Sequence, residues 1–197
     1  MTLVPVNRRE FFLYVALGVA TFVTYFVTCR LVQAPTVVEM PGWVPFIPLL
    51  TVPYLLQVVV SYVLAMFIQA KALRHAVFKA YFLAMAAVFS IWITYPTTMR
   101  RPPAPDGWWN WPFAVMASAD LPVHIVPAGH ILMPVLIIWA FAYERPRWLW
   151  WLMPAELVGA AGIATTWQHR PIDVLYGVAL AVTAGLVFGV HRRRVTV

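Results

Sequence analysis

A histidine and an aspartate stand four residues apart in the segment 168–177, where a long apolar run begins. If that run is helical, the side chains of His169 and Asp173 lie on one face of the helix. A carboxylate that accepts a hydrogen bond from one ring nitrogen holds an imidazole in one tautomer, which leaves the other nitrogen available as a base or nucleophile. At a membrane boundary, such a pair predicts chemistry on a lipid.

Two other segments carry residues suited to phosphate chemistry. Arg100 and Arg101 lie in the long connection over residues 95–124, and His130 stands at the start of the next apolar run. Guanidinium groups bind phosphate oxygens, one imidazole can attack phosphorus, and a second can protonate the leaving oxygen. These segments therefore predict phosphoryl transfer by two histidines with separate roles.

The composition indicates the kind of fold that holds these residues in place. The 197 residues are 62% hydrophobic and only 11% charged, which is typical of a polytopic membrane protein. At about 20 residues for each span, the chain has room for roughly six helices. We therefore predict an all-α fold, a six-transmembrane-helix bundle forming one integral-membrane domain over residues 1–197. The expected spans are the apolar runs 11–28, 44–69, 77–94, 125–143, 148–166 and 172–190.

The basic residues divide unevenly between the two sides of such a bundle. One side has ten, which are Arg8, Arg9, Lys71, Arg74, Lys79, Arg145, Arg147, Arg192, Arg193 and Arg194, and the other has four, Arg30, Arg100, Arg101 and Arg170. Because positively charged loops resist translocation, this asymmetry predicts that both termini are cytoplasmic. The histidines then face the external side, which we expect to be the periplasmic side of a bacterial inner membrane. The net charge of +7 is explained by topology and contact with anionic lipid, and we expect no nucleic-acid partner.

Three short motifs follow one another along the chain. Residues 95–102 read Tyr-Pro-Thr-Thr-Met-Arg-Arg-Pro, residues 127–130 read Pro-Ala-Gly-His, and His169 is followed by Asp173 and Gly177. Together they resemble the motifs of the type 2 phosphatidic acid phosphatase superfamily, whose members are membrane lipid phosphatases and phosphotransferases.

The position of Asp120 and the proline-rich residues 45–54 resemble the inositol phosphorylceramide synthase-like branch of that superfamily. The resemblance covers about residues 43–190. It implies a bundle of six spans, as the apolar runs also do.

The resemblance also implies a role for each matched residue. His169 attacks phosphorus to form a phosphohistidine, and Asp173 orients it. His130 protonates the departing oxygen, while Arg101 and the backbone amide of Gly129 bind the phosphoryl oxygens. Water then releases phosphate, and the resemblance implies a metal-independent reaction without a cofactor.

The phosphate-binding residues depart from the family pattern at three places in the chain. Thr94 stands where the family has lysine, Ala128 where it has serine, and residues 162–163 read Gly-Ile where it has Ser-Arg. Arg100 and Arg170 are the nearest basic residues to the matched motifs. We therefore expect them to substitute as substrate-binding groups.

These observations predict an integral-membrane lipid phosphatase that hydrolyses a lipid phosphate or diphosphate presented by the bilayer. The nearest alternative is a phosphotransferase of the same fold that passes a phosphoryl-headgroup to a lipid or sugar alcohol, since water and alcohol would react with the same intermediate. A non-enzymatic haem-binding or transport protein is a third alternative. Both histidines are expected at one interface, which disfavours haem ligation, and transmembrane prolines such as Pro134 and Pro154 are weak indicators of transport.

Other polar and aromatic residues are expected to have structural roles. His75 and His124 suit hydrogen-bonded positions at the boundary. The tryptophans of residues 108–111 and 148–151 suit an interfacial belt. Glu156 stands near the middle of one expected span, where an ionised carboxylate is costly, so we expect it to be protonated or paired inside the bundle.

Overall fold

The computed structural model describes residues 6–33 and 35–192, and these residues are mostly helical. Seven α-helices occur in this part of the chain: α1 (Arg8–Leu31), α2 (Thr51–Met66), α3 (Lys71–Thr94), α4 (Trp111–Ala119), α5 (Leu132–Glu144), α6 (Leu149–Thr165) and α7 (Pro171–Val187). The two-residue strands β1 (Thr36–Val37) and β2 (Thr97–Thr98) pair in parallel. Short 3-10 turns are η1 (Pro48–Leu50), η2 (Trp108–Asn110), η3 (Gly129–Ile131), η4 (Pro146–Trp148) and η5 (Val190–Arg192).

Each of the six predicted apolar runs falls on one long helix, and the all-α fold class is confirmed. Within the described residues, three helices are long and apolar enough to cross a membrane: Arg8–Leu31, Pro48–Met66 and Lys71–Thr94. Gly129–Glu144 and Pro171–Val187 are shorter apolar helices. These lengths and compositions are compatible with a membrane protein.

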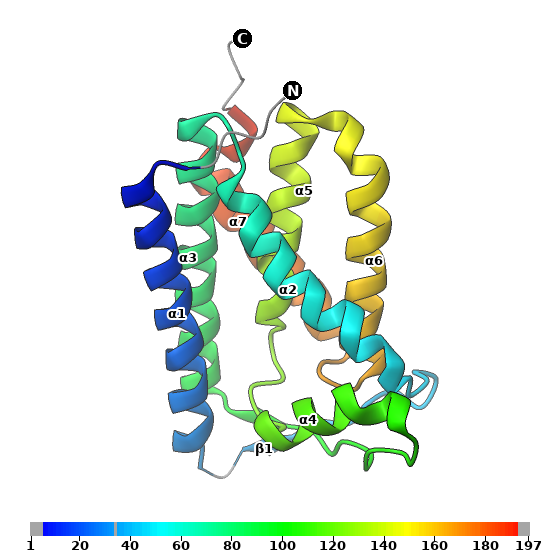
Figure 1. The fold of residues 1–197 in the computed structure, drawn as a ribbon. Helices are drawn as coiled ribbons and strands as arrows, with labels where there is room; N and C mark the ends of the chain where they lie inside the picture. The colour runs from blue at the N-terminus through cyan, green and yellow to red at the C-terminus, as the bar shows by residue number, and fades with distance from the viewer. Residues whose placement is uncertain (1–5, 34, 193–197) are drawn as a thin grey trace.

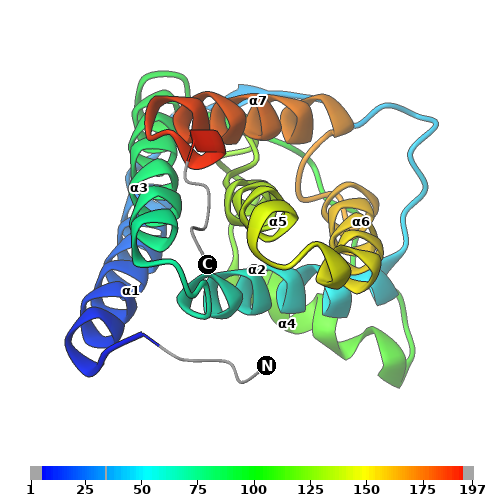
Figure 2. The ribbon, with the colours of Figure 1, turned by 90° about the horizontal axis from the view of Figure 1, so that it is seen from above.

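The long helices run alternately up and down, and α4 lies across one end of the bundle (Figure 1). Helix α5 is at the centre, where it packs against α2, α3, α6 and α7 (Figure 2). Its buried side chains, such as Leu136 and Phe141, are fully inaccessible and form the middle of the main core. Helix α1 packs mainly on α3 and leaves its outer side chains, among them Phe12 and Phe22, exposed.

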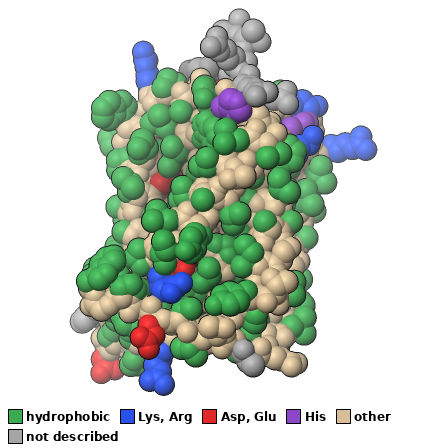
Figure 3. Space-filling view, turned by 180° about the vertical axis from the view of Figure 1, so that it is seen from behind, with side chains coloured by type: hydrophobic (Ala, Val, Ile, Leu, Met, Phe, Trp, Pro, Cys, Tyr) green, Lys and Arg blue, Asp and Glu red, His purple; other side chains and the backbone are tan. Residues whose placement is uncertain are grey.

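The outer surface suits a lipid environment. Hydrophobic side chains are spread over the whole height of the flank seen in Figure 3, and few charged side chains lie between its two ends. A water-soluble monomer rarely exposes so many large apolar side chains on one face.

The alternation of the helices brings the connections to two ends. The start of α1, the α2–α3 and α5–α6 connections and the end of α7 lie at the upper end of Figure 1. The two strands, α4 and the starts of α5 and α7 lie at the lower end. The two groups of basic residues thus lie at opposite ends of the bundle, except that Arg193 and Arg194 are outside the described residues.

Candidate active site

The two predicted catalytic histidines meet at the lower end of the bundle. His130 lies in η3 directly before α5, and His169 lies in the turn directly before α7. Helices α5 and α7 pack side by side and begin at the same end, so the residues that precede them come together. His130 Nδ1 lies 3.2 Å from His169 Nε2, which is hydrogen-bonding distance.

The partners of the two rings define which nitrogen carries each proton. His169 Nδ1 lies 2.5 Å from the backbone oxygen of Ile125, which can only accept, so this nitrogen carries a hydrogen. In the neutral ring, His169 Nε2 then has a lone pair, and His130 Nδ1 donates to it. The remaining nitrogen, His130 Nε2, lies 3.2 Å from the hydroxyl of Tyr54, which donates in turn. The result is a directed chain of hydrogen bonds from Tyr54 through His130 and His169 to Ile125.

The environment of His169 favours the neutral imidazole. Its side chain is only 3% exposed, and this burial lowers its pKa to about 3. Repulsion from His130 and Arg101 acts in the same direction, and the hydrogen bond to Ile125 opposes it without cancelling it. At neutral pH, His169 therefore has the lone pair on Nε2 that a nucleophile needs.

Arg101 is held beside the histidines by Asp120. Its Nη1 donates to the Asp120 backbone oxygen at 2.8 Å, and its Nη2 donates to carboxylate Oδ2 at 2.9 Å. The Tyr25 hydroxyl donates to the other carboxylate oxygen. Arg101 Nε is buried and has no hydrogen-bond partner among the described residues. This donor is available for a phosphoryl oxygen, and the amide of Gly129, at the start of η3, is a second candidate because the first amides of a helix lack partners within it.

Asp173 has a different partner from the one predicted. It lies in the first turn of α7, is fully buried, and forms a two-pronged ion pair with Arg170 at 2.9 Å (Nε to Oδ2) and 2.8 Å (Nη2 to Oδ1). It also accepts from the backbone amide of Arg170 at 2.9 Å. The hydrogen bond that was expected to orient His169 is made by the Ile125 carbonyl instead.

The two substitute arginines occupy different environments. The Arg170 guanidinium is engaged by Asp173, whose hydrogen bonds raise the pKa of Arg170. Arg100 is exposed, and no hydrogen bond or ion pair in the described part of the chain joins it to His130 or His169. Of the three arginines, Arg101 is the one whose charge acts on His169.

Two glycines permit the close approach of helices at the site. A Cβ atom on Gly177 would stand 2.3 Å from the backbone oxygen of Ala128, so α7 packs directly on the segment that leads into His130. A Cβ atom on Gly162 would stand 2.7 Å from the backbone oxygen of Leu50 and 3.0 Å from the Cβ of Tyr54. Gly162 occupies a position where the family pattern has serine, and here it lets α6 approach the start of α2.

Sequence reasoning did not identify four contributors to the site: Tyr25, Tyr54, Thr97 and Ile125. Thr97 is fully buried, and its hydroxyl accepts from the amides of Ile125 at 3.0 Å and Val126 at 3.1 Å. Thr97 and Tyr54 both stand within segments that were singled out for their resemblance, which was the available signal. Ile125 contributes only a backbone carbonyl, for which side-chain type gives no signal.

Comparison of the chain with protein-family models, curated proteins and solved structures gives no match. The resemblance to the phosphatase superfamily therefore stays a prediction, and the site is interpreted by its own geometry. Two imidazoles in contact, one of them neutral by burial, lie beside a buried guanidinium with an unused donor. Such a set of side chains can bind an anionic group and transfer a proton while a bond in that group is broken and another is formed.

Proposed function

We propose that this chain is an integral-membrane lipid phosphatase, which hydrolyses a lipid phosphate or diphosphate through a phosphohistidine at His169. The observation that carries the proposal is the 3.2 Å contact between His130 Nδ1 and His169 Nε2. Phosphoryl transfer needs a nucleophile that reaches phosphorus and an acid within reach of the leaving oxygen, and this contact brings two imidazoles to one place. Rings at opposite ends of the bundle would have excluded such a reaction.

In the first step, the phosphoryl group of the bound substrate displaces the hydrogen bond that His130 Nδ1–H makes to His169 Nε2, and phosphorus then lies next to this nitrogen. Arg101 Nε binds a phosphoryl oxygen, and the negative charge of the substrate favours a second proton on His130. Imidazolium His130 then donates its Nε2–H to the Tyr54 oxygen and its Nδ1–H to the leaving oxygen. The bond from His169 Nε2 to phosphorus forms, the bond from phosphorus to the lipid oxygen breaks, and the lipid leaves as an alcohol.

In the second step, water attacks the phosphorus of the phosphohistidine. His130 Nδ1, now without its proton, accepts one from the attacking water. The bond from phosphorus to His169 Nε2 breaks, and phosphate leaves. His130 thus acts as the acid in one step and the base in the other.

We further propose that the six long helices all cross the bilayer and that both termini are cytoplasmic. The alternation of the helices and the unequal distribution of basic residues between the two ends support this orientation. The site then faces the periplasm of a bacterial inner membrane. The shorter helices α6 and α7 pack on the central helix α5.

The decisive experiment measures phosphate release by the purified full-length protein from a panel of lipid phosphates and diphosphates. His169→Asn keeps a donor for the Ile125 carbonyl and removes Nε2, so we expect release to fall by roughly four orders of magnitude or more. With a substrate labelled in its phosphoryl group, the label should be recovered covalently bound to the wild-type protein and not to this variant. Chelators should leave turnover unchanged.

The matched control is His75→Asn. His75 lies in α3 near the opposite end and contacts Glu10 at 3.4 Å, so its replacement should leave phosphate release unchanged. Wild-type release by His169→Asn would exclude the phosphohistidine mechanism.

A further inference from the structure

Helix α1 is attached to the candidate active site at its lower end. Most of its side chains are exposed, and the buried ones are Tyr14, near its start, and Thr28 and Cys29, near its end. Strand β1 follows α1 and pairs with β2, and Arg101 comes shortly after β2. The end of α1 is therefore held close to the segment that carries Arg101.

Tyr25, one turn before Cys29, makes two kinds of contact with the site. Its ring lies edge-on to Trp92 and to His130, at 5.7 Å and 6.4 Å between ring centroids. Its hydroxyl donates to Asp120 Oδ1. The resemblance to the phosphatase superfamily covers about residues 43–190, so it implies nothing about Tyr25.

Asp120 gives each of its carboxylate oxygens to a different partner. Oδ1 accepts from Tyr25, and Oδ2 accepts from Arg101 Nη2 at 2.9 Å. Arg101 Nη1 donates to the Asp120 backbone oxygen at 2.8 Å, and Arg101 Nε has no partner among the described residues. The guanidinium therefore keeps N–H donors for another ligand.

The pair formed by Arg170 and Asp173 shows a closed arrangement of the same two side-chain types. There, Nε and Nη2 of the arginine donate to separate oxygens of one carboxylate, at 2.9 Å and 2.8 Å. Such a fork of two parallel hydrogen bonds is the favoured geometry of an arginine with a carboxylate. At Asp120 the fork is prevented, because Tyr25 occupies the oxygen that Arg101 Nε would need.

Loss of the Tyr25 hydroxyl would remove this obstacle. Asp120 Oδ1 would then lack its donor in a setting where the side chains of Asp120 and Arg101 are only 15% and 8% exposed. An unsatisfied oxygen with little access to water is costly, and the nearby guanidinium is the group that can satisfy it. Arg101 would turn toward Asp120 and have fewer donors for a phosphoryl oxygen.

We propose that Tyr25 is a positioning residue, which occupies one oxygen of Asp120 and thereby keeps the Arg101 guanidinium available to the phosphoryl group. The inference rests on the proposed phosphatase function, which supplies the phosphoryl group. It gives α1 a part in substrate binding. Tyr25 acts through Asp120 and Arg101 and does not touch the substrate.

The test is equilibrium binding of inorganic phosphate to the purified full-length protein, together with kcat and KM for a lipid phosphate. Tyr25→Phe keeps the ring beside Trp92 and removes the hydroxyl. We expect Kd for phosphate and KM to rise by roughly tenfold, as for loss of one hydrogen bond to a charged group, with kcat little changed. Asp120→Ala has no carboxylate for Tyr25 to hold, so adding Tyr25→Phe to it should weaken phosphate binding no further.

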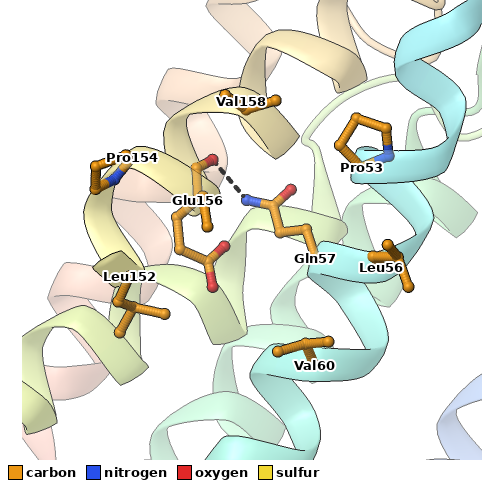
Figure 4. A pocket seen from close by; sticks show the side chains of 9 residues that line it. Pro53, Leu56, Gln57, Val60, Leu152, Pro154, Glu156 and Val158 are labelled. Atoms are coloured by element: carbon orange, nitrogen blue, oxygen red, sulfur yellow. Dashed lines mark hydrogen bonds between the residues drawn. The ribbon is translucent and has the colours of Figure 1, made fainter. Parts of the chain in front are cut away.

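Ser61→Ala is the matched control, because it also removes a hydroxyl that donates to a carboxylate of another segment. Ser61 lies on α2 about two turns from Tyr54, and its hydroxyl donates to Glu156 Oε1 at 2.6 Å. Figure 4 shows Glu156 on α6 opposite Gln57 of α2, whose amide donates to the Glu156 backbone oxygen at 3.0 Å. This substitution should leave phosphate binding unchanged.

Four results would overturn the inference. They are wild-type phosphate affinity in Tyr25→Phe, no phosphate binding by wild type, a further loss when Tyr25→Phe is added to Asp120→Ala, and equal losses in Tyr25→Phe and Ser61→Ala. A further loss would mean that Tyr25 acts independently of Asp120, and equal losses would mean that only the packing of the bundle matters. Tyr25-dependent phosphate binding without phosphate release from any lipid phosphate would overturn the phosphatase function and leave the positioning of Arg101 in place.

Discussion

The imidazole Nδ1 of His169 lies 2.5 Å from the backbone carbonyl oxygen of Ile125. This carbonyl holds the tautomer that a carboxylate was expected to hold, but it brings no full negative charge. A carboxylate in this place would stabilise imidazolium and raise the pKa of His169. The carbonyl leaves His169 neutral, so in the proposed reaction His130 is the residue that supplies the proton for the leaving group.

Tyr54→Phe tests the role of the hydroxyl that contacts His130 Nε2. The ring and its packing are retained, but imidazolium His130 loses the partner for one of its two N–H groups. Because a hydrogen bond to a charged group contributes about 1.5–3 kcal/mol, we expect kcat to fall by at least about tenfold. KM should change little, since Tyr54 acts through His130 and does not touch the phosphate.

Tyr62→Phe is the matched control for Tyr54. Tyr62 lies further along α2, and its hydroxyl donates to the backbone oxygen of Tyr14 at 2.7 Å, remote from the histidines. Its loss should leave kcat unchanged. Equal effects of the two substitutions would mean that Tyr54 matters only for packing.

The helices were predictable because each has a long apolar run, and the proximity of the two histidines was predictable because each stands at the start of an apolar run that begins at the same end of the bundle. The partner of Asp173 was not predictable in this way, because a shared helix face requires both His169 and Asp173 to lie within the helix. Helix α7 begins only at Pro171, so His169 lies before the helix and its side chain does not share a face with Asp173. Asp173 is then in the first turn, where it bonds back to Arg170.

A second difference concerns the start of the central helix. The apolar run was expected to be a span from residue 125, whereas α5 begins at Leu132. Residues 125–128 are not helical, and Pro127 has no amide to donate. Hydropathy cannot distinguish such a segment from a helix, yet it is this segment that supplies the carbonyl for His169.

Gly177→Ala tests the contact between α7 and the segment that leads into His130. The added Cβ would stand 2.3 Å from the Ala128 backbone oxygen and 2.4 Å from Ile131 Cγ2, so the helix has to move. We expect the free energy of unfolding to fall by about 1–3 kcal/mol and phosphate release to fall with it, because the separation of the two rings changes. Gly42→Ala is the control, since nothing lies within 4 Å of its added Cβ. Similar stabilities for the two variants would argue against this account of the helix contact.

Arg170→Ala distinguishes a structural arginine from a phosphate ligand. Removing the guanidinium leaves the fully buried carboxylate of Asp173 without its ion-pair partner, which should lower the free energy of unfolding by about 3 kcal/mol. The double variant Arg170→Ala/Asp173→Ala should recover part of this loss, because it no longer contains a buried unpaired charge. A raised KM with unchanged stability would instead identify Arg170 as a substrate-binding group.

The low pKa of His169 predicts how stability depends on pH. The unfolded chain takes up a proton on His169 near its usual pKa of 6.5, whereas the folded protein does so only near 3. Above about pH 6.5 both states are neutral at this residue, so it adds no pH dependence. As the pH falls from 6.5 towards 3, the unfolded state binds more protons, and the contribution of His169 to stability declines by at most about 1.4 kcal/mol per pH unit.

The variant His169→Asn tests this pH dependence, because it lacks the titrating ring. As the pH falls from 6.5 towards 3, the unfolding free energy of wild type should decrease relative to that of this variant. Chemical denaturation in mixed micelles at a series of pH values measures this difference, and a constant value would contradict the burial of a neutral imidazole at this position.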